Sequence, residues 1–208
     1  MSNSPVIEPQ QQRSLDSTRR LLDAATELIA ENGFAEATFA AISERAGFSR
    51  GIVSTRFGSK EGLLWALVER STEPWMPLVT ARDATGTGLD RIIVLVRAIG
   101  EHARHDPQAL RVLQRVIIEA AESSPGLQAR MEHAVEVIRE YARSLFDQGI
   151  RDGSVRSTVN APVAADLLVV TLRGISYQWF LYPDQVDVVS LHDGLVDFVT
   201  AAYSSRQP

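Results

Sequence analysis

Apolar side chains recur at helical spacing along most of the chain. In the first such segment Leu21, Leu22, Ala25, Leu28 and Ile29 fall on one side of a helix and form a single stripe. No alternating run of β-branched and polar residues with a hairpin turn interrupts the pattern. The spacing therefore predicts an all-α fold of about nine helices.

Glycines, prolines and small polar residues mark where these helices should begin and end. Gly33, Gly47 and Gly58 stand at expected helix ends, because glycine adopts the left-handed conformation that stops a helix. Thr38, Ser49 and Ser59 stand where a hydroxyl can cap the next helix. The pattern predicts helices over about 16–32, 38–46, 49–57, 59–73, 89–105, 108–122, 126–150, 162–181 and 187–204.

The predicted helices fall into two blocks. Residues 1–13 are rich in Ser, Pro and Gln, and we expect them to be a disordered arm. Residues 14–63 hold the first three helices, and residues 64–208 hold the longer ones. The organisation predicts a small N-terminal module joined to a larger helical domain.

Residues 38–57 have the pattern of a helix-turn-helix, two short helices joined by a turn that contains glycine. Val53 and Phe57 would pack against the preceding helices. The opposite side would carry small or basic residues, namely Arg50, Gly51, Ser54 and Thr55. Such a face suits the major groove, since arginine can pair with guanine and small hydroxyls let the backbone approach. The same spacing also fits an ordinary helical hairpin without a nucleic-acid partner.

The segment from Ala24 to Leu63 resembles the DNA-binding domain of the tetracycline-repressor (TetR) family. The matching positions are Ala24–Ala25, Gly33–Phe34, Thr38, Ile42, Ala46–Val53 and Phe57–Leu63. The resemblance implies a DNA-binding domain at 14–63 and a helical domain for ligand binding and dimerisation at 64–208. It also implies that the partner is double-stranded operator DNA.

The resemblance assigns expected roles to single residues. Thr38 matches a position that contacts a backbone phosphate, and Lys60 matches the family's common phosphate-binding lysine. Lys60 would also open a helix whose free N–H groups favour an anion. Arg50, Gly51 and Ile52 match the base-recognising start of the recognition helix.

Two positions depart from the family pattern. Ser54 and Arg56 stand where the family commonly has Tyr and either His or Tyr, aromatic residues that touch the DNA backbone. Ser54 is too short to replace a tyrosine, whereas Arg56 can reach a phosphate. The full expected set of DNA-binding residues is Thr38, Ser49, Arg50, Gly51, Ile52, Ser54, Thr55, Arg56 and Lys60.

The net charge of −5 does not argue against this role, because charge is unevenly distributed. Basic and acidic side chains are equal in number between residues 13 and 63, so the remainder of the chain carries the whole excess of acid. Within that segment the basic groups from Arg45 to Lys60 lie close together.

The C-terminal helices predict a homodimer. The segment 167–172 is apolar on every side of a helix, which requires burial on all sides and hence a partner subunit. The last helix adds an apolar stripe too wide for one packed face, and the family dimerises through its last two long helices. The expected dimerisation residues are Leu168, Leu172, Gly174, Leu195 and Phe198. The alternative is a monomer with a thick core.

Five residues are candidates for binding a small-molecule effector, because each brings a polar group to an otherwise apolar helix. They are Trp75, His102, Tyr141, Arg173 and Tyr177. A neighbouring side chain could equally satisfy each polar group. His102 and His105 also share a helix face as a possible metal-ligand pair, but no third ligand is identifiable, so we expect no metal and no cofactor.

Other function classes find little support in the sequence. The chain has no cysteine, which excludes thiolate chemistry and disulfides. It has no nucleophile elbow, phosphate loop or zinc-protease motif, no signal peptide and no apolar stretch long enough to span a membrane. We expect a cytoplasmic, non-enzymatic regulator, most simply a dimeric repressor that a small molecule releases from DNA. A helical enzyme or carrier without a DNA role and a DNA-binding activator are the alternatives.

Overall fold

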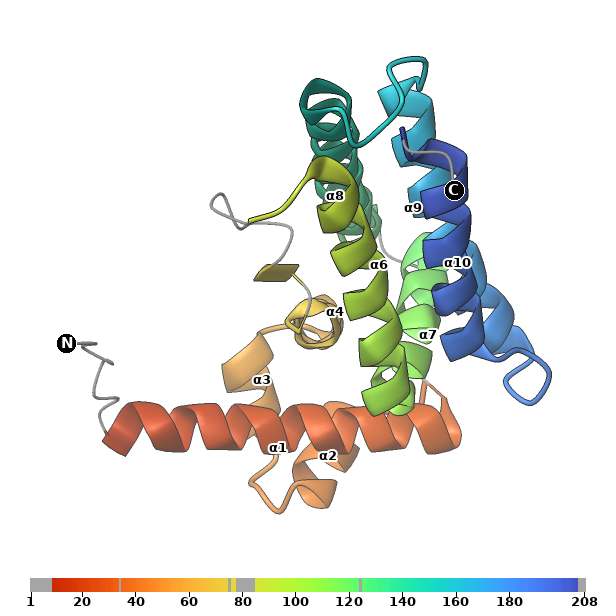
Figure 1. Ribbon diagram of the computed structural model, residues 1–208. Coiled ribbons are helices and arrows are strands. Elements are labelled where there is room, and N and C mark those ends of the chain that lie inside the picture. Colours follow the sequence, from red (N-terminus) through yellow and green to blue (C-terminus); the bar gives the residue numbers. More distant parts are fainter. Residues whose placement is uncertain (1–8, 34, 75, 78–84, 124, 206–208) are drawn as a thin grey trace. The chain divides into compact units, whose positions relative to one another are not determined.

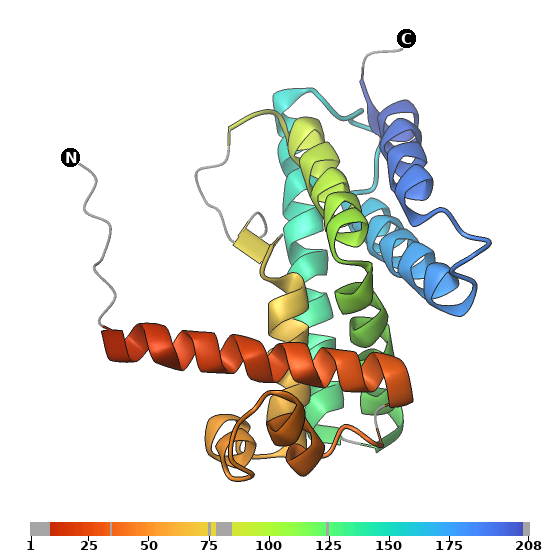
Figure 2. The same ribbon diagram turned by 90° about the horizontal axis from the view of Figure 1, so that it is seen from below.

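The computed structural model describes residues 9–33, 35–74, 76–77, 85–123 and 125–205. Within these ranges the chain forms nine helices and no β-strand, so the predicted all-α fold is confirmed. The helices are α1 (Pro9–Asn32), α2 (Phe39–Arg45), α3 (Ile52–Phe57), α4 (Lys60–Thr72), α6 (Gly88–His105), α7 (Pro107–Ser123), α8 (Pro125–Asp152), α9 (Ala161–Leu181) and α10 (Val188–Tyr203). They divide into two compact units, Met1–Glu69 and Arg70–Pro208 (Figures 1 and 2).

The first helix is longer than the sequence pattern predicts. α1 begins at Pro9, so residues 9–13, which we expected to be disordered, are helical, and residues 1–8 lie outside the described part of the chain. Proline suits the first position of a helix, because its missing N–H would have no partner there. The Gln12 amide also donates to the Asp16 carboxylate at 3.1 Å, one turn further on.

The N-terminal unit packs α2 and α3 beside α1. Leu21, Ala25 and Ile29 of α1 are fully buried, as are Ile42 of α2 and Val53 of α3. These positions belong to the apolar stripe and helix faces that the spacing predicts. The recognition helix is therefore fixed to the unit by one side only, and its other side stays exposed.

The caps of the N-terminal unit agree with the sequence at three positions and differ at one. Thr38 accepts a hydrogen bond from the Ala41 N–H at 3.2 Å and Ser59 accepts one from Gly62 at 3.1 Å, as predicted. Gly47 has a φ of +73°, which makes the turn between α2 and α3. The prediction that Ser49 caps α3 is wrong. α3 begins at Ile52 because the Ser49 carbonyl, not its hydroxyl, accepts the Ile52 N–H at 3.1 Å in a preceding turn.

The C-terminal unit packs α6 against α8 and α10, and α8 against α7 and α9. Gly88 and Gly149 let α6 begin directly against α8, since a Cβ at Gly88 would lie 2.2 Å from the Gly149 nitrogen. Its core gathers buried side chains from α6, α8, α9 and α10, among them Ile92, Val96, Ala142, Leu145, Phe146, Leu168, Leu172, Leu195 and Val199.

The chain following α8 is fastened to the end of α10. Val155 and Ser204 form an antiparallel bridge, and the Arg156 N–H donates to the Tyr203 carbonyl at 3.0 Å. The Tyr203 ring meets Phe146 of α8 edge-on at 5.0 Å between ring centroids. These contacts hold the loop before α9 against the last turn of α10.

Candidate functional site

The expected DNA-binding residues lie on the exposed side of the N-terminal unit. All of them are exposed except Ile52, which is half-buried. We call the outward set formed by Arg50, Gly51, Ser54, Thr55 and Lys60 the α3–α4 edge. A Cβ built at Gly51 meets nothing within 4 Å, so the protein itself leaves space at the start of α3. The edge thus combines two cations with small residues that permit close approach.

The Ser54 and Thr55 hydroxyl groups of α3 are oriented by the carbonyl of Gly51, the residue just before the helix. Ser54 and Thr55 both donate to the Gly51 carbonyl oxygen, at 3.0 and 2.9 Å. Their hydrogens are therefore engaged, and the outward oxygen lone pairs remain to accept hydrogen bonds. Acceptors of this kind suit the amino groups of adenine or cytosine in the major groove.

Arg56, for which the sequence suggested a phosphate contact, makes hydrogen bonds within the N-terminal unit, and the phosphate contact stays a prediction. Its guanidinium donates to the hydroxyl of Ser14 at 2.6 Å and to that of Ser17 at 3.1 Å, both on α1. These bonds connect the last turn of α3 to the first half of α1. Arg56 therefore links α3 to α1 in this structure, and local spacing carries no signal of this link because the partners lie about 40 residues earlier.

Two further arginines hold the helix-turn-helix and were missed in the sequence. Arg20 donates to the Ala46 carbonyl at 2.7 Å, and its guanidinium lies 4.7 Å from the centre of the Phe48 ring. Arg45 pairs with Glu27 at 3.2 Å and Glu31 at 2.8 Å on α1. Local spacing carries no signal of this ion pair, because Arg45 lies 14 and 18 residues after the two glutamates and on another helix.

These contacts separate the basic residues between positions 45 and 60 into two groups. The hydrogen bond from Arg45 lowers the pKa of Glu31, and the same bond raises the pKa of Arg45, so this pair stays ionised. Arg45 and Arg56 face α1, whereas Arg50 and Lys60 remain on the α3–α4 edge. Lys60 is the first residue of α4, where a helix N-terminus adds to the attraction for a phosphate.

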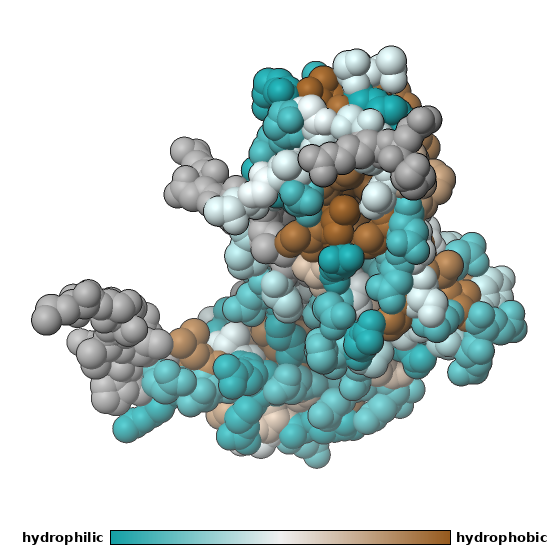
Figure 3. All heavy atoms as spheres, in the orientation of Figure 1, coloured by the Kyte–Doolittle hydropathy of each residue, from teal (hydrophilic) through white to brown (hydrophobic). Residues whose placement is uncertain are grey.

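A second exposed surface, on the C-terminal unit, is apolar. The α9–α10 face consists of Val163, Leu167, Val170, Tyr177 and Leu181 on α9 and Leu191 and Phe198 on α10, with Gly174 and Gly194 exposed between them. Their spacing brings the α9 members to one side of that helix. In the view of Figure 3, hydrophobic surface gathers on the C-terminal unit, while the N-terminal unit presents mainly hydrophilic side chains. An exposed apolar face of this extent marks a contact with another molecule.

The expected dimerisation residues separate into two groups. Leu168, Leu172 and Leu195 are buried within their own subunit, so their assignment to the surface of an interface is wrong. Gly174 is exposed on the α9–α10 face, and 61% of Phe198 is exposed. The sequence could not separate these groups, because both sides of α9 are apolar.

Four of the five expected ligand-binding residues lie in the described part of the chain, and they differ in their surroundings. Trp75 lies outside the described residues, and Arg173 and Tyr177 are exposed on α9. Tyr141 is half-buried and packs against Leu95 with Met76 and Ile138. The sequence-based set is therefore dispersed among the described residues, and Tyr141 alone has the mixed apolar and polar surroundings of a small-molecule site.

Arg91 is the neighbour of Tyr141 that sequence reasoning missed. It donates to the Tyr141 hydroxyl at 3.3 Å and to the Gln148 side chain at 2.8 Å. Its guanidinium lies 5.8 Å from the centre of the Tyr141 ring. The available signal was its position one turn before Leu95 on the apolar side of α6. Arg91, Tyr141 and Gln148 thus form a polar cluster between α6 and α8 beside apolar side chains.

His102 lies elsewhere on α6. Its Nε2 atom is buried without a hydrogen-bond partner, and burial lowers the pKa of the imidazole. The Nε2 atom of His105 instead lies 3.4 Å from the carboxylate oxygen Oε2 of Glu101. Among the described residues, no group of three or more His, Cys, Asp or Glu side chains could hold a metal ion. In the same residues no helix is long and apolar enough to cross a bilayer.

Known proteins resemble this chain over both units. Residues 21–67 match the family described as "Bacterial regulatory proteins, tetR family". The fatty acid metabolism regulator protein of Bacillus subtilis is 20% identical over 90% of this chain and 95% of its own length. The transcriptional activator FasR of Mycolicibacterium smegmatis is 26% identical over 89% of this chain and 82% of its own.

Solved structures share the fold. SmeT, the repressor of the Stenotrophomonas maltophilia multidrug efflux pump SmeDEF, superposes with a TM-score of 0.75 at 24% identity, over 91% of this chain and 93% of its own. FadR from Bacillus subtilis in complex with stearoyl-CoA has a TM-score of 0.74 at 18% identity, over 88% and 98%. The helix-turn-helix geometry and the family match agree that residues 21–67 are a DNA-binding domain of the tetR family of bacterial regulatory proteins, and the chain as a whole is similar to transcriptional regulators of that family.

Proposed function

We propose that this regulator is a repressor that binds a near-palindromic operator as a homodimer and leaves it when a small molecule binds. The observation that carries the proposal is the α3–α4 edge, where Arg50 and Lys60 are exposed beside small residues. We assign base recognition to Arg50, Gly51, Ser54 and Thr55 and phosphate contacts to Thr38 and Lys60. Ser49 and Ile52, before and at the start of α3, complete the proposed DNA-binding set.

The α9–α10 face supports the dimer. Two copies joined by this face would bury its apolar side chains, and exposed glycines at 174 and 194 would let helices approach closely. The dimer would place two recognition helices in successive major grooves, about 34 Å apart. We therefore assign DNA binding to residues 14–63 and dimerisation with effector binding to residues 64–208.

The effector would bind near the polar cluster of Arg91, Tyr141 and Gln148. This cluster adjoins the apolar side chains of Leu95 and Ile138, so it suits a molecule with an apolar body and a polar or anionic group. Related structures hold stearoyl-CoA in FadR and triclosan in SmeT, which both have large apolar parts. A tenfold change in operator affinity requires about 1.4 kcal/mol of coupling, within the usual range for allostery.

Selection from random DNA duplexes, followed by fluorescence anisotropy, tests the DNA part. Two half-sites spaced one helical turn apart should be enriched, and the affinity should fall steeply with salt. If no sequence is enriched above random DNA, the operator proposal is wrong. Stearoyl-CoA and triclosan are the first effector probes. A probe that binds must weaken operator binding by the factor by which the operator weakens binding of the probe.

An activator is the second candidate, because FasR is a relative and is named an activator. Transcription in vitro from a promoter that carries the selected operator separates the two, since a repressor lowers the yield of transcript and an activator raises it. Either role would place the protein with the chromosome in the bacterial cytoplasm. Neither role requires catalysis, and we propose no reaction for this chain.

A further inference from the structure

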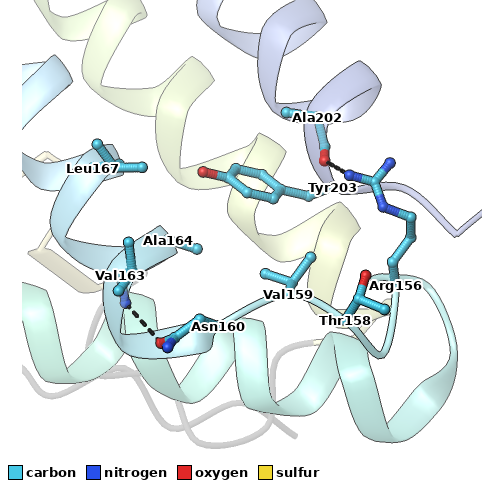
Figure 4. A pocket seen from close by; sticks show the side chains of 9 residues that line it. All are labelled: Arg156, Thr158, Val159, Asn160, Val163, Ala164, Leu167, Ala202 and Tyr203. Carbon is cyan, nitrogen blue, oxygen red and sulfur yellow. Dashed lines mark hydrogen bonds between the residues drawn. The ribbon is translucent and has the colours of Figure 1, made fainter.

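A pocket of about 190 Å³ lies at one end of the α9–α10 pair (Figure 4). The loop before α9 and the first turns of α9 form one wall, and the last turn of α10 forms the other. Val159, Val163, Ala164 and Leu167 line the first wall, and Ala202 and Tyr203 line the second. The bridge between Val155 and Ser204 holds the two walls together, so the pocket is a fixed feature of the fold.

Two polar side chains around this pocket, those of Arg156 and Asn160, are engaged within the subunit. The Arg156 guanidinium donates to the Ala202 carbonyl, and the Asn160 side chain accepts from the Val163 N–H at 3.2 Å to cap α9 (Figure 4). The rest of the lining consists of aliphatic side chains, the Tyr203 ring and one small hydroxyl residue, Thr158, so it is mainly apolar. An apolar group is therefore the occupant that this pocket would favour.

The pocket opens onto the α9–α10 face, because Val163 and Leu167 belong to both. Resting on the dimer put forward under Proposed function, we propose that the pocket receives the partner subunit's Phe198. Phe198 is the most exposed aromatic side chain of the face, with 61% of it exposed, and it lies one turn before Ala202 on α10. It does not line the pocket of its own subunit. In a two-fold interface each copy would supply one such ring and one such pocket.

An aromatic side chain inserted in a pocket is the usual anchor of an interface. Phe198 would transfer most of its ring from water to an apolar site, twice in each dimer. Val170 is an exposed aliphatic side chain like Leu167, with 65% of it exposed, but it does not line the pocket. Leu167 and Val170 thus form a matched pair on one helix face, and only Leu167 should be coupled to Phe198.

A double-mutant cycle on the dimer dissociation constant tests the proposal, with sedimentation as the measurement. Phe198→Ala should raise the dissociation constant about 30-fold or more, and Leu167→Ala about tenfold. The two changes together should raise it little further than Phe198→Ala alone, because they remove one shared contact. Phe198→Ala with Val170→Ala should instead multiply the single effects. Multiplication in both pairs would overturn the proposal while leaving the dimer intact.

The absence of natural cysteine allows a second measurement. A thiol at Ala202→Cys should react with Ellman's reagent at least about tenfold more slowly in the dimer than a control thiol at exposed Ser144→Cys. Adding Phe198→Ala should restore fast reaction, at a concentration where sedimentation still finds dimers. Equal protection with and without Phe198 would mean another occupant, such as a small molecule, and would overturn the proposal. A wild-type chain that is monomeric would refute the proposed dimer itself.

Discussion

The α3–α4 edge and the α9–α10 face are both exposed, and they differ in chemistry. The first has cations, hydroxyl oxygens and a glycine on a short helix, and the second has aliphatic and aromatic side chains on two long helices. Polar groups can stay hydrated until a phosphate or a base edge replaces the water. Apolar groups gain free energy only when another apolar surface covers them.

The proposed function gives these two surfaces different partners, DNA for the first and a second subunit for the second. The proposed DNA binding on the α3–α4 edge would depend on charge and fall with salt, whereas the proposed association through the α9–α10 face would depend on apolar burial and respond little to salt. Salt concentration should therefore change operator affinity without dissociating the dimer.

The largest expected effect comes from a charge placed beneath the α9–α10 face. Leu195 is 6% exposed within its own subunit, so Leu195→Arg would bury an unpaired charge. We expect a loss of at least about 4 kcal/mol in the free energy of unfolding, measured by urea denaturation. A variant with wild-type stability would show that Leu195 is not part of the subunit core.

Phe198→Arg, three positions after Leu195 on the same helix, should act differently. The exposed side chain leaves the subunit folded, but the charge at the interface should shift the protein from dimer to monomer at micromolar concentration. Sedimentation measures this shift, and operator affinity should fall with it, because one half-site binds weakly. Val94→Arg on α6 is the control, since Val94 is exposed outside the face. If Val94→Arg also dissociated the dimer, the effect of Phe198→Arg could not be assigned to the α9–α10 face.

The next effect separates the two cations of the α3–α4 edge. Arg50→Ala should cost about 1–3 kcal/mol on the operator and relax preference at one base pair. Lys60→Ala should weaken operator and scrambled DNA equally and reduce the salt slope by about one unit for each subunit. A salt titration on both DNAs measures the difference. The reverse result would mean that α3 docks differently.

A smaller effect distinguishes a positioning role for Arg56 from a phosphate contact. If Arg56 acts through Ser14 and Ser17, then Arg56→Ala and the pair Ser14→Ala with Ser17→Ala should each cost about 1–2 kcal/mol of operator binding. Combining all three changes should add little further loss. The salt slope should stay at its wild-type value. If Arg56→Ala alone flattens that slope, the side chain leaves α1 and binds phosphate.

The smallest effect is a pH dependence within the C-terminal unit. The His192 Nε2 atom is buried without a partner against Gly100, while Nδ1 lies 2.6 Å from the Val188 carbonyl oxygen. Burial lowers the pKa of His192, so the unfolded chain binds more protons below about pH 6.5. Stability should be full above that pH and decrease as the pH falls, by at most about 1.4 kcal/mol per pH unit for one proton.

The variant His192→Asn isolates this contribution. Its amide can still donate to the Val188 carbonyl but does not titrate, so the decline in unfolding free energy below pH 6.5 should be shallower. Burial also lowers the pKa of His102, but both proteins retain this residue, so it does not contribute to the difference between their pH profiles. Identical pH profiles would show that His192 is protonated equally in the folded and unfolded chains.

The sequence by itself determined the helices and the location of the DNA-binding module. Caps such as Thr38 and Ser59 and the turn at Gly47 act within a few residues, so local spacing carries them. The same spacing placed Val53 inward and Arg50 outward on the recognition helix. These features depend on neighbours along the chain, and one sequence is enough to find them.

Tertiary structure alone decided which apolar side of α9 is buried and which partner Arg56 has. Leu168 and Leu167 are adjacent and equally apolar, yet α8 covers the first side of α9 and leaves the second exposed. Arg56 reaches Ser14 and Ser17, and the pocket joins the start of α9 to the end of α10, across about 40 residues in each case. Periodicity describes a helix on its own, and the choice between two apolar faces is made by the helices that pack against it.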